Sequence, residues 1–286
     1  MLNLIRMNLF RMVHTKSVIV VFIVLMLFAN ISSCLTLTAG ESIEMAKEMK
    51  EGQVEFYEPD AASGDFGIYI NTPVKSDGTL KEYVYVYFSI SSGLLLLFIL
   101  IGAVLFFRGD EKNGFIKNIA GQTKHKHNIM LSKLVAVGIY TFVCMFCYML
   151  IGYLTFVTEI ALVEGGISFG IKYLPEAIKI FALQYLLYMA FISGLLLITE
   201  VTKSTAAGIT AGSFGIMGFG MLFVTISQKV FNTDFDISKY YISTNISKVN
   251  MDAGADIIKF ALGIGIVYFI IYNVLNFLWF LKRDVV

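Results

Sequence analysis

Cysteine and histidine are the side chains in this sequence best suited to metal binding or redox chemistry, and their spacing argues against both. Cys144 and Cys147 form a C-x-x-C pair inside an apolar run, without the second pair that a structural metal site needs. His125 and His127 alternate with lysines, and that positive charge disfavours a bound cation. We therefore interpret the cysteines as small packing residues and the histidines as part of a solvated basic loop.

Other catalytic patterns are equally weak. The segment GGISFGIK at residues 165–172 is superficially similar to a phosphate-binding loop, but Ile171 stands where the lysine belongs. Away from their ends, the long apolar runs contain no Asp, Glu, Lys, Arg or His, the residues that ion-coupled carriers and intramembrane enzymes need at membrane depth. We expect no catalytic, nucleotide-binding, metal or other cofactor site in this chain. Energy for any work it performs must then come from a partner.

The composition places the chain in lipid. Of its 286 residues, 57% are hydrophobic and only 15% are charged, whereas a soluble domain carries about 25% charged residues. A helix needs about 20 apolar residues to cross a hydrocarbon core about 30 Å thick. We predict an all-α membrane protein with a single domain over residues 1–286 and six spans, at 17–37, 85–107, 133–157, 177–199, 205–227 and 257–281.

Residues 1–16 precede the first span and have the pattern of an amphipathic helix. Apolar residues recur at helical spacing, with basic residues between them: Leu2, Ile5, Leu9, Met12 and Val13 among Arg6, Arg11 and Lys16. This pattern predicts a helix lying in the inner membrane interface before the chain turns into the first span. A ragged extension of the first span is the alternative.

Charge fixes the predicted orientation. An even number of spans puts both termini on one side, and the positive-inside rule identifies that side as cytoplasmic. With this topology the inside holds 12 basic and 4 acidic residues, and the outside holds 10 basic and 17 acidic residues. The two larger outer segments are an insert at 38–84, with a short charged helix and a loop, and a loop at 228–256. The fifth span contains small residues suited to close helix packing, among them Gly208, Gly212 and Gly215.

The longest inner segment, residues 108–132, has the punctuation of a short helix. Asp110 and Glu111 stand where a helix dipole favours acid, and Gly121 can end the helix. Between them Phe115, Ile116 and Ile119 share one face, flanked by Lys112 and Lys117. By pattern alone, this face suits the lipid surface and a groove in a partner protein equally well.

The layout resembles the permease subunits of bacterial ATP-binding-cassette (ABC) transporters of the type-2 exporter class. In that class the loop between the second and third spans reads as an acid, a glycine, a hydrophobic-basic helix, a polar turn and Ser-Lys at the next span. This sequence has Glu111, Gly114, Phe115-Ile116-Lys117-Asn118 and Ser132-Lys133. The family often has arginine in the polar turn, where this chain has Thr123-Lys124-His125-Lys126.

The resemblance implies a coupling helix that seats in the ATPase subunit. Its contacts would be Glu111, Lys112, Gly114, Phe115, Ile116, Lys117 and Ile119, with a secondary contact at Glu200 and Lys203. It also implies two ATPase subunits, which would hold ATP and Mg, and a second permease, identical or related. The expected substrate is hydrophobic or amphipathic: a peptide antibiotic, a lipid or a drug. The expected location is the bacterial cytoplasmic membrane, among membrane lipid and without a nucleic-acid partner.

Two other function classes remain open from the sequence. A non-transporting sensor, scaffold or immunity protein would bind a ligand through the outer insert 38–84 and signal through its inner helix. An intramembrane enzyme is disfavoured because the apolar runs lack catalytic residues. Neither the substrate nor the choice between a homodimer and a heterodimer follows from the sequence.

Overall fold

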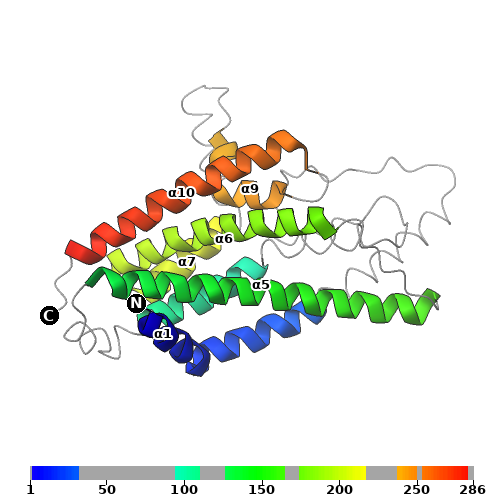
Figure 1. Ribbon diagram of the computed structural model, residues 1–286, viewed down its shortest axis with the longest axis horizontal. Helices are drawn as coiled ribbons and strands as arrows, with labels where there is room; N and C mark the ends of the chain where they lie inside the picture. The colour runs from blue at the N-terminus through cyan, green and yellow to red at the C-terminus, as the bar shows by residue number, and fades with distance from the viewer. Residues whose placement is uncertain are drawn as a thin grey trace.

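The structure is a computed structural model that describes residues 2–31, 94–109, 126–164, 174–216, 237–249 and 253–282. These ranges form helices and contain no β-strand, which confirms the all-α class (Figure 1). In chain order the helices are α1 (Leu2–His14), the helix Lys16–Ile31, the helix Leu94–Gly109, α5 (Lys126–Glu164), α6 (Leu174–Thr202), α7 (Thr205–Ile216), the 3-10 helix η2 (Ile237–Tyr240), α9 (Ile242–Lys248) and α10 (Ala255–Lys282).

Three of these helices are long and apolar enough to cross a membrane: Asn128–Leu154 within α5, Ala177–Thr202 within α6, and α10. A fourth crossing is made if α1 and the helix Lys16–Ile31 count as one bent span. Each of the six predicted apolar runs overlaps a described helix, although Leu94–Gly109 and α7 are shorter than a full span in their described parts. Six crossings and the orientation of the termini therefore stay predictions.

The helix α5 differs most from its predicted span. It begins at Lys126 rather than at residue 133 and ends at Glu164 rather than at residue 157. Its 39 residues would measure roughly 58 Å at 1.5 Å per residue, well beyond a hydrocarbon core of about 30 Å. The part at 126–132, predicted as loop, is thus the first turns of the helix, because apolar periodicity ends where a helix leaves lipid and not where it unwinds.

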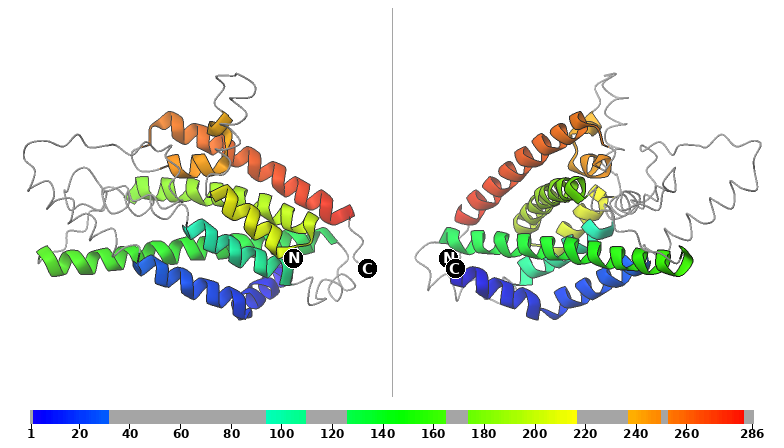
Figure 2. Two further views of the ribbon diagram at one scale, coloured as in Figure 1. Left: turned by 180° about the vertical axis from the view of Figure 1, so that it is seen from behind. Right: turned by 45° about the vertical axis from the view of Figure 1, so that its right-hand side comes forward.

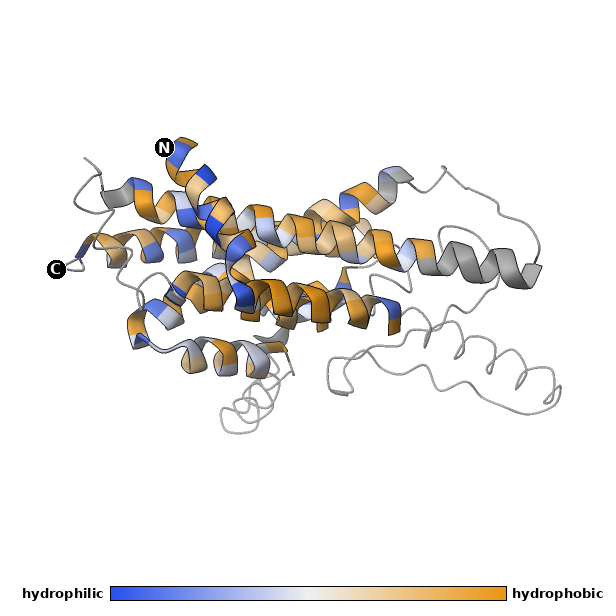
Figure 3. Cartoon of the chain, turned by 90° about the horizontal axis from the view of Figure 1, so that it is seen from below, coloured by the Kyte–Doolittle hydropathy of each residue, from blue (hydrophilic) through white to orange (hydrophobic). Residues whose placement is uncertain are grey.

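The N-terminal segment is a helix that turns sharply into the next one. The axes of α1 and the helix Lys16–Ile31 differ by 66°. Thr15 stands at the bend: its hydroxyl donates to the carbonyl of Arg11 (2.7 Å), and its own carbonyl accepts from the amide of Val18 (2.9 Å). In Figure 3 α1 carries alternating polar and apolar residues and crosses the more uniformly apolar helices. The helix and its bend agree with the predicted amphipathic segment, and its place in the interface stays a prediction.

The helix α6 lies at the centre of the bundle and contacts α5, α7, α9 and α10. Its longest contact is with α10, which runs in the same direction (Figure 1). Gly194 faces the ring of Tyr272, and Gly265 of α10 faces Leu186 and Leu187. A larger side chain at either glycine would meet these neighbours, so the small residues set the helix separation.

Neutral polar groups reinforce the contact between α6 and α10. The amide of Asn276 donates to the carbonyl of Ser193 (2.8 Å). The amide of Asn273 donates to the hydroxyl of Ser193 (3.2 Å) and to the carbonyl of Phe269 (2.7 Å). In lipid, where apolar burial does not drive association, such bonds fix which faces of two helices meet.

The glycines of α7 that were predicted to pack closely against other helices do so within this chain. A side chain at Gly208 would meet Thr199 of α6 and Val104 of the helix Leu94–Gly109. A side chain at Gly212 would meet Leu100 and Leu195 of the same two helices, and Gly215 lies against Phe191. The small face of α7 is therefore covered by its own neighbours.

The described part of the loop 228–256 does not simply lie outside the bundle. The helix α9 packs on α6 and α10, and η2 packs on α9 (Figures 1 and 2). The side-chain amide of Gln184 donates to the carbonyls of Ile246 and Val249, both at 2.9 Å. Because Gly265 lies beside Leu186, Gln184 is about two helical turns below the start of α10 at Ala255. The described segment thus folds back against the bundle, near the end where α10 begins.

Candidate functional site: the inner polar cluster

Four parts of the chain meet at the end of the bundle where α1 begins and α10 ends (Figures 1 and 2). They are α1, the end of the helix Leu94–Gly109, the start of α5, and the turn between α6 and α7. We call this the inner end, following the predicted topology. Their polar side chains form what we name the inner polar cluster: Asn8, Arg108, Ser132, Lys133, Glu200 and Lys203.

Lys133 joins the two helices that flank the predicted coupling loop. Its side chain is 2% exposed. The ammonium Nζ donates to the carbonyl of Phe107 (3.3 Å) and lies 4.7 Å from the centroid of the Phe107 ring. The carbonyl lies close to Gly109, the last described residue of the helix Leu94–Gly109. Lys133, in the second turn of α5, thus bonds to the main chain of the neighbouring helix.

Arg108 makes a corresponding connection to the turn between α6 and α7. Its guanidinium donates to the carbonyl of Lys203. Lys203 has φ of 53°, the left-handed conformation that commonly ends a helix, although glycine is the usual residue there. Ser204 directly precedes α7 and caps its first turn, because its hydroxyl accepts from the amide of Ala207 (3.3 Å). The turn is short and held at both ends.

Asn8 and Ser132 attach α1 to the start of α5. The amide of Asn8 donates to the hydroxyl of Ser132 (2.9 Å), which in turn donates to the carbonyl of Ile129 (2.8 Å). Both side chains are buried. Met12, one turn after Asn8, is buried on the same side of α1. Ser132 therefore fixes α5 to α1, and Lys133 fixes α5 to the helix Leu94–Gly109.

Glu200 adds a buried carboxylate to the inner end. Its side chain is 3% exposed, and it lies one turn before Lys203 on α6. Burying a carboxylate or an ammonium is costly unless opposite charge or hydrogen-bond donors surround it. Glu200 and Lys133 are both buried at this end, so these two charges lie inside the folded bundle.

The cluster surrounds the predicted coupling loop at its base. The residues predicted to contact an ATPase lie outside the described residues: Glu111, Lys112, Gly114, Phe115, Ile116, Lys117 and Ile119. The helices on either side of them are described up to Gly109 and from Lys126. Of the predicted secondary contacts, Lys203 is exposed whereas Glu200 is buried. Lys203 is therefore accessible to a partner, whereas the side chain of Glu200 lies inside the bundle.

Three residues that form buried hydrogen bonds in the structure were not identified from the sequence. Asn8 interrupts the apolar face of α1, and Gln184 and Asn276 stand inside apolar runs. All three are buried and hydrogen-bonded. The sequence does carry a signal for them, because an amide in an apolar run needs a hydrogen-bond partner. Among the described residues no group of three or more His, Cys, Asp or Glu side chains is arranged to hold a metal ion.

The fold and this site define the class: an all-helical integral membrane protein whose inner helix ends are joined by buried polar contacts. Within that class the chain belongs to the family of proteins of unknown function DUF2705, whose model matches residues 54–286. No match was found among curated proteins or among solved structures.

Proposed function

We propose that this chain is the membrane-spanning subunit of an ABC exporter in the bacterial cytoplasmic membrane. It would move a hydrophobic or amphipathic substrate, of which a peptide antibiotic, a lipid and a drug are examples. ATP and Mg would bind in two separate ATPase subunits, and a second permease, identical or related, would complete the translocation path.

The observation that carries the proposal is the bracing of both helices that flank the loop 108–132. Lys133 bonds to the carbonyl of Phe107 across the base of this loop, and Arg108 bonds to the carbonyl of Lys203. A force applied to the loop would therefore move the helix Leu94–Gly109, α5 and the turn between α6 and α7 together. Energy supplied by a partner requires such a connection, whereas a loop on flexible stems would dissipate the motion.

The sequence of the loop supports the same function. Its acid, glycine and hydrophobic-basic helix resemble the coupling segment of type-2 exporters, as does the Ser132-Lys133 pair that follows. The structure gives both members of that pair a buried role. The absence of Asp, Glu, Lys, Arg and His from the interiors of the apolar runs is a further support, because ion-coupled carriers usually need such residues at membrane depth.

The test is a crosslink from the predicted contact surface. A photoreactive amino acid would replace Phe115 in the full chain, in native membranes, and the crosslinked partner would be identified by mass spectrometry. We expect a protein with nucleotide-binding P-loop and Walker B sequences. Phe115→Asp or Ile116→Asp should abolish co-purification of that partner and substrate-stimulated ATP hydrolysis.

Thr123→Asp is the matched control, because it adds the same charge to the same loop outside the apolar face. We expect this variant to retain the partner and the hydrolysis rate. Crosslinks to lipid alone would instead favour the membrane surface as the binding site of this helix. Crosslinks to a protein without nucleotide-binding sequences, with no substrate flux in vesicles, would favour the sensor or scaffold function and overturn the proposal.

A further inference from the structure

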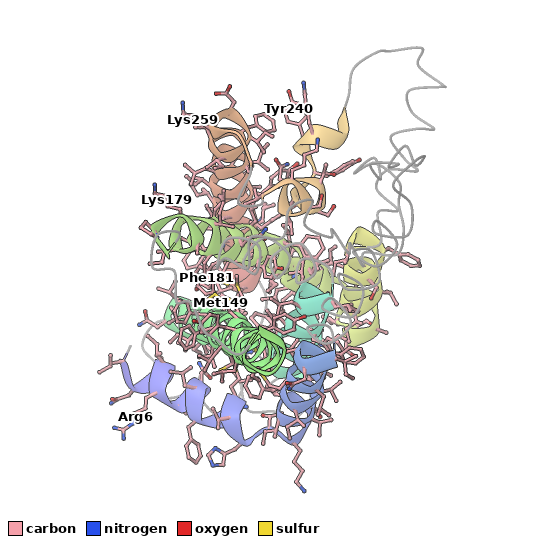
Figure 4. The ribbon with its side chains drawn as sticks, turned by 90° about the vertical axis from the view of Figure 1, so that its right-hand side faces the viewer. Arg6, Met149, Lys179, Phe181, Tyr240 and Lys259 are labelled. Atoms are coloured by element: carbon pink, nitrogen blue, oxygen red, sulfur yellow. The ribbon has the colours of Figure 1, made fainter. Side chains whose placement is uncertain are left out.

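The outward face of α1 is the largest feature that the proposed function does not use. It combines exposed apolar and basic side chains: Leu2, Phe10 and Val13 are 80%, 63% and 67% exposed, and Arg6 and His14 are exposed beside them. Figure 4 shows Arg6 pointing away from the bundle. Exposed apolar residues mixed with cations on one helix face are typical of helices that bind at a lipid–water interface.

The rotation of α1 about its axis is set by contacts on its opposite side. At 100° per residue, Asn8 and Met12 project from the side opposite Arg6 and Phe10. Asn8 is bonded to Ser132, and Met12 is buried. The amphipathic surface is therefore turned outward by the fold itself and not by chance orientation of a loose terminus.

The depth of α1 is set by the same hydrogen bond. Ser132 immediately precedes the apolar run of α5 that begins at residue 133. The bond from Asn8 therefore holds α1 at the level where α5 enters the hydrocarbon. The 66° bend at Thr15 turns α1 away from the direction of the helix Lys16–Ile31 and toward the membrane plane. A face that looks outward at this level meets lipid headgroups.

The charge of this region selects the lipid. Residues 1–40 contain Arg6, Arg11 and Lys16 and no Asp or Glu. Arg6 and Lys16 are exposed. Anionic headgroups give the inner leaflet a negative surface potential, which attracts each nearby lysine or arginine by about 1 kcal/mol, or roughly fivefold in affinity. A zwitterionic headgroup gains no such attraction.

From these observations we infer that the outward face of α1 is a docking surface for anionic lipid of the inner leaflet. Arg6 of this face and Lys16, the first residue of the next helix, bind the headgroups, and Leu2, Phe10 and Val13 enter the upper acyl region. Because Asn8 bonds to Ser132 at the start of α5, a lipid bound to α1 is connected to the inner polar cluster. The inference does not depend on an ATPase partner.

Fluorescence quenching in vesicles tests this surface, because the chain has a single tryptophan, Trp279. The full chain with Trp279→Phe and Phe10→Trp would be reconstituted with brominated phosphatidylglycerol or brominated phosphatidylcholine, with bromines near the headgroup or deep in the chain. We expect quenching of Trp at position 10 mainly by shallow bromines. Phosphatidylglycerol should quench roughly threefold or more better than phosphatidylcholine at equal mole fraction.

Two further variants make the result specific. Val267→Trp in the same background is the control, because Val267 is exposed on the apolar helix α10; it should be quenched by deep bromines without headgroup preference. Adding Arg6→Gln and Lys16→Gln to the Phe10→Trp protein should abolish the preference for phosphatidylglycerol and retain shallow quenching.

The inference is overturned if Trp at position 10 is not quenched by either lipid, or is quenched equally by both. Loss of quenching when a protein partner binds would assign the face to that partner and also overturn it.

Discussion

At the inner end of the bundle, Lys133 and Arg108 donate to main-chain carbonyls at the ends of two helices, whereas in the outer half Gln184 does the same for α9. In both regions a main-chain carbonyl needs a hydrogen-bond donor. The last carbonyls of a helix have no amide of their own helix to accept from, and lipid offers none. The donors differ: they are charged at the inner end and neutral at Gln184.

Depth explains the difference. The inner end lies where helices leave the apolar runs, so an ammonium or guanidinium there is close to water and headgroups. Gln184 lies about two turns below the start of α10. A cation at that depth would be expensive, and an amide supplies two N–H donors without a net charge. Charged capping residues therefore mark the membrane boundary, and neutral ones mark the interior.

The two regions also differ in what they connect. The outer contact fastens a loop segment, η2 and α9, onto a helix that is already central to the bundle. The inner contacts join α1, the helix Leu94–Gly109, α5 and the turn between α6 and α7 to one another. Loss of the outer contact should release one element, and loss of an inner contact should loosen the relation between several helices.

The largest expected effect is at Gln184. Gln184→Leu removes both hydrogen bonds to α9 and leaves the carbonyls of Ile246 and Val249 without that donor. An orphaned buried acceptor costs about 1–3 kcal/mol, so the variant should lower the thermal unfolding midpoint in detergent. With Cys34, Cys144 and Cys147 replaced by Ala, Ser247→Cys should react faster with a water-soluble maleimide once α9 detaches.

Met189→Leu is the control for this change, because it alters a buried residue of the same helix without removing a hydrogen bond. We expect it to leave both measurements near those of the starting protein. Unchanged maleimide reactivity and midpoint in Gln184→Leu would show that α9 is held by apolar contacts, and the contrast between the two regions would then fail.

A smaller loss is expected at Lys133. Lys133→Met keeps the length and apolar stem but removes the bond to the carbonyl of Phe107 and the contact with its ring. One acceptor loses its donor here, instead of two at Gln184. We expect a loss of about 1 kcal/mol, measured as a fall in the unfolding midpoint.

Lys133→Arg should retain most of this stability, because it keeps a cationic donor at the same place. If the proposed coupling is correct, Lys133→Met should also lower the ratio of substrate transported to ATP hydrolysed, since the braced helices would no longer move together. Equal stability of the Met and Arg variants would show that the stem, and not the charge, fixes these helices.

The sequence predicted the helical class and the apolar runs well, because lipid imposes a strong constraint on both. Boundaries were less accurate: hydropathy reports where α5 enters lipid, while the helix itself begins at Lys126. The folded-back segment at α9 was not predicted, because its seven residues, ISTNISK, lack a long apolar run. Its position is set by tertiary contacts that no local pattern contains, namely the hydrogen bonds from Gln184 and the burial of Ile242 and Ile246.

The candidate site was predicted in part for similar reasons. Lys203 and Glu200 were placed in the inner turn by topology, and the structure then separated an exposed lysine from a buried glutamate. Burial of Lys133 could not be read from its position at the end of an apolar run, because a lysine there can equally extend to the headgroups. Asn8 was not identified from the sequence, because its bond to Ser132 spans 124 positions.

The smallest effect is expected at Lys203, where main chain and side chain have separate roles. The carbonyl of Lys203 accepts from Arg108, and φ of 53° is a conformation that glycine adopts without strain. Lys203→Gly should therefore leave the unfolding midpoint unchanged or raise stability by up to about 1 kcal/mol, whereas Lys203→Val should lower it. The exposed side chain is the part available to a partner, so Lys203→Gly should weaken ATPase binding without loss of stability. A glycine variant that is less stable than the lysine protein would mean that the side chain, and not only the carbonyl, holds this inner turn together.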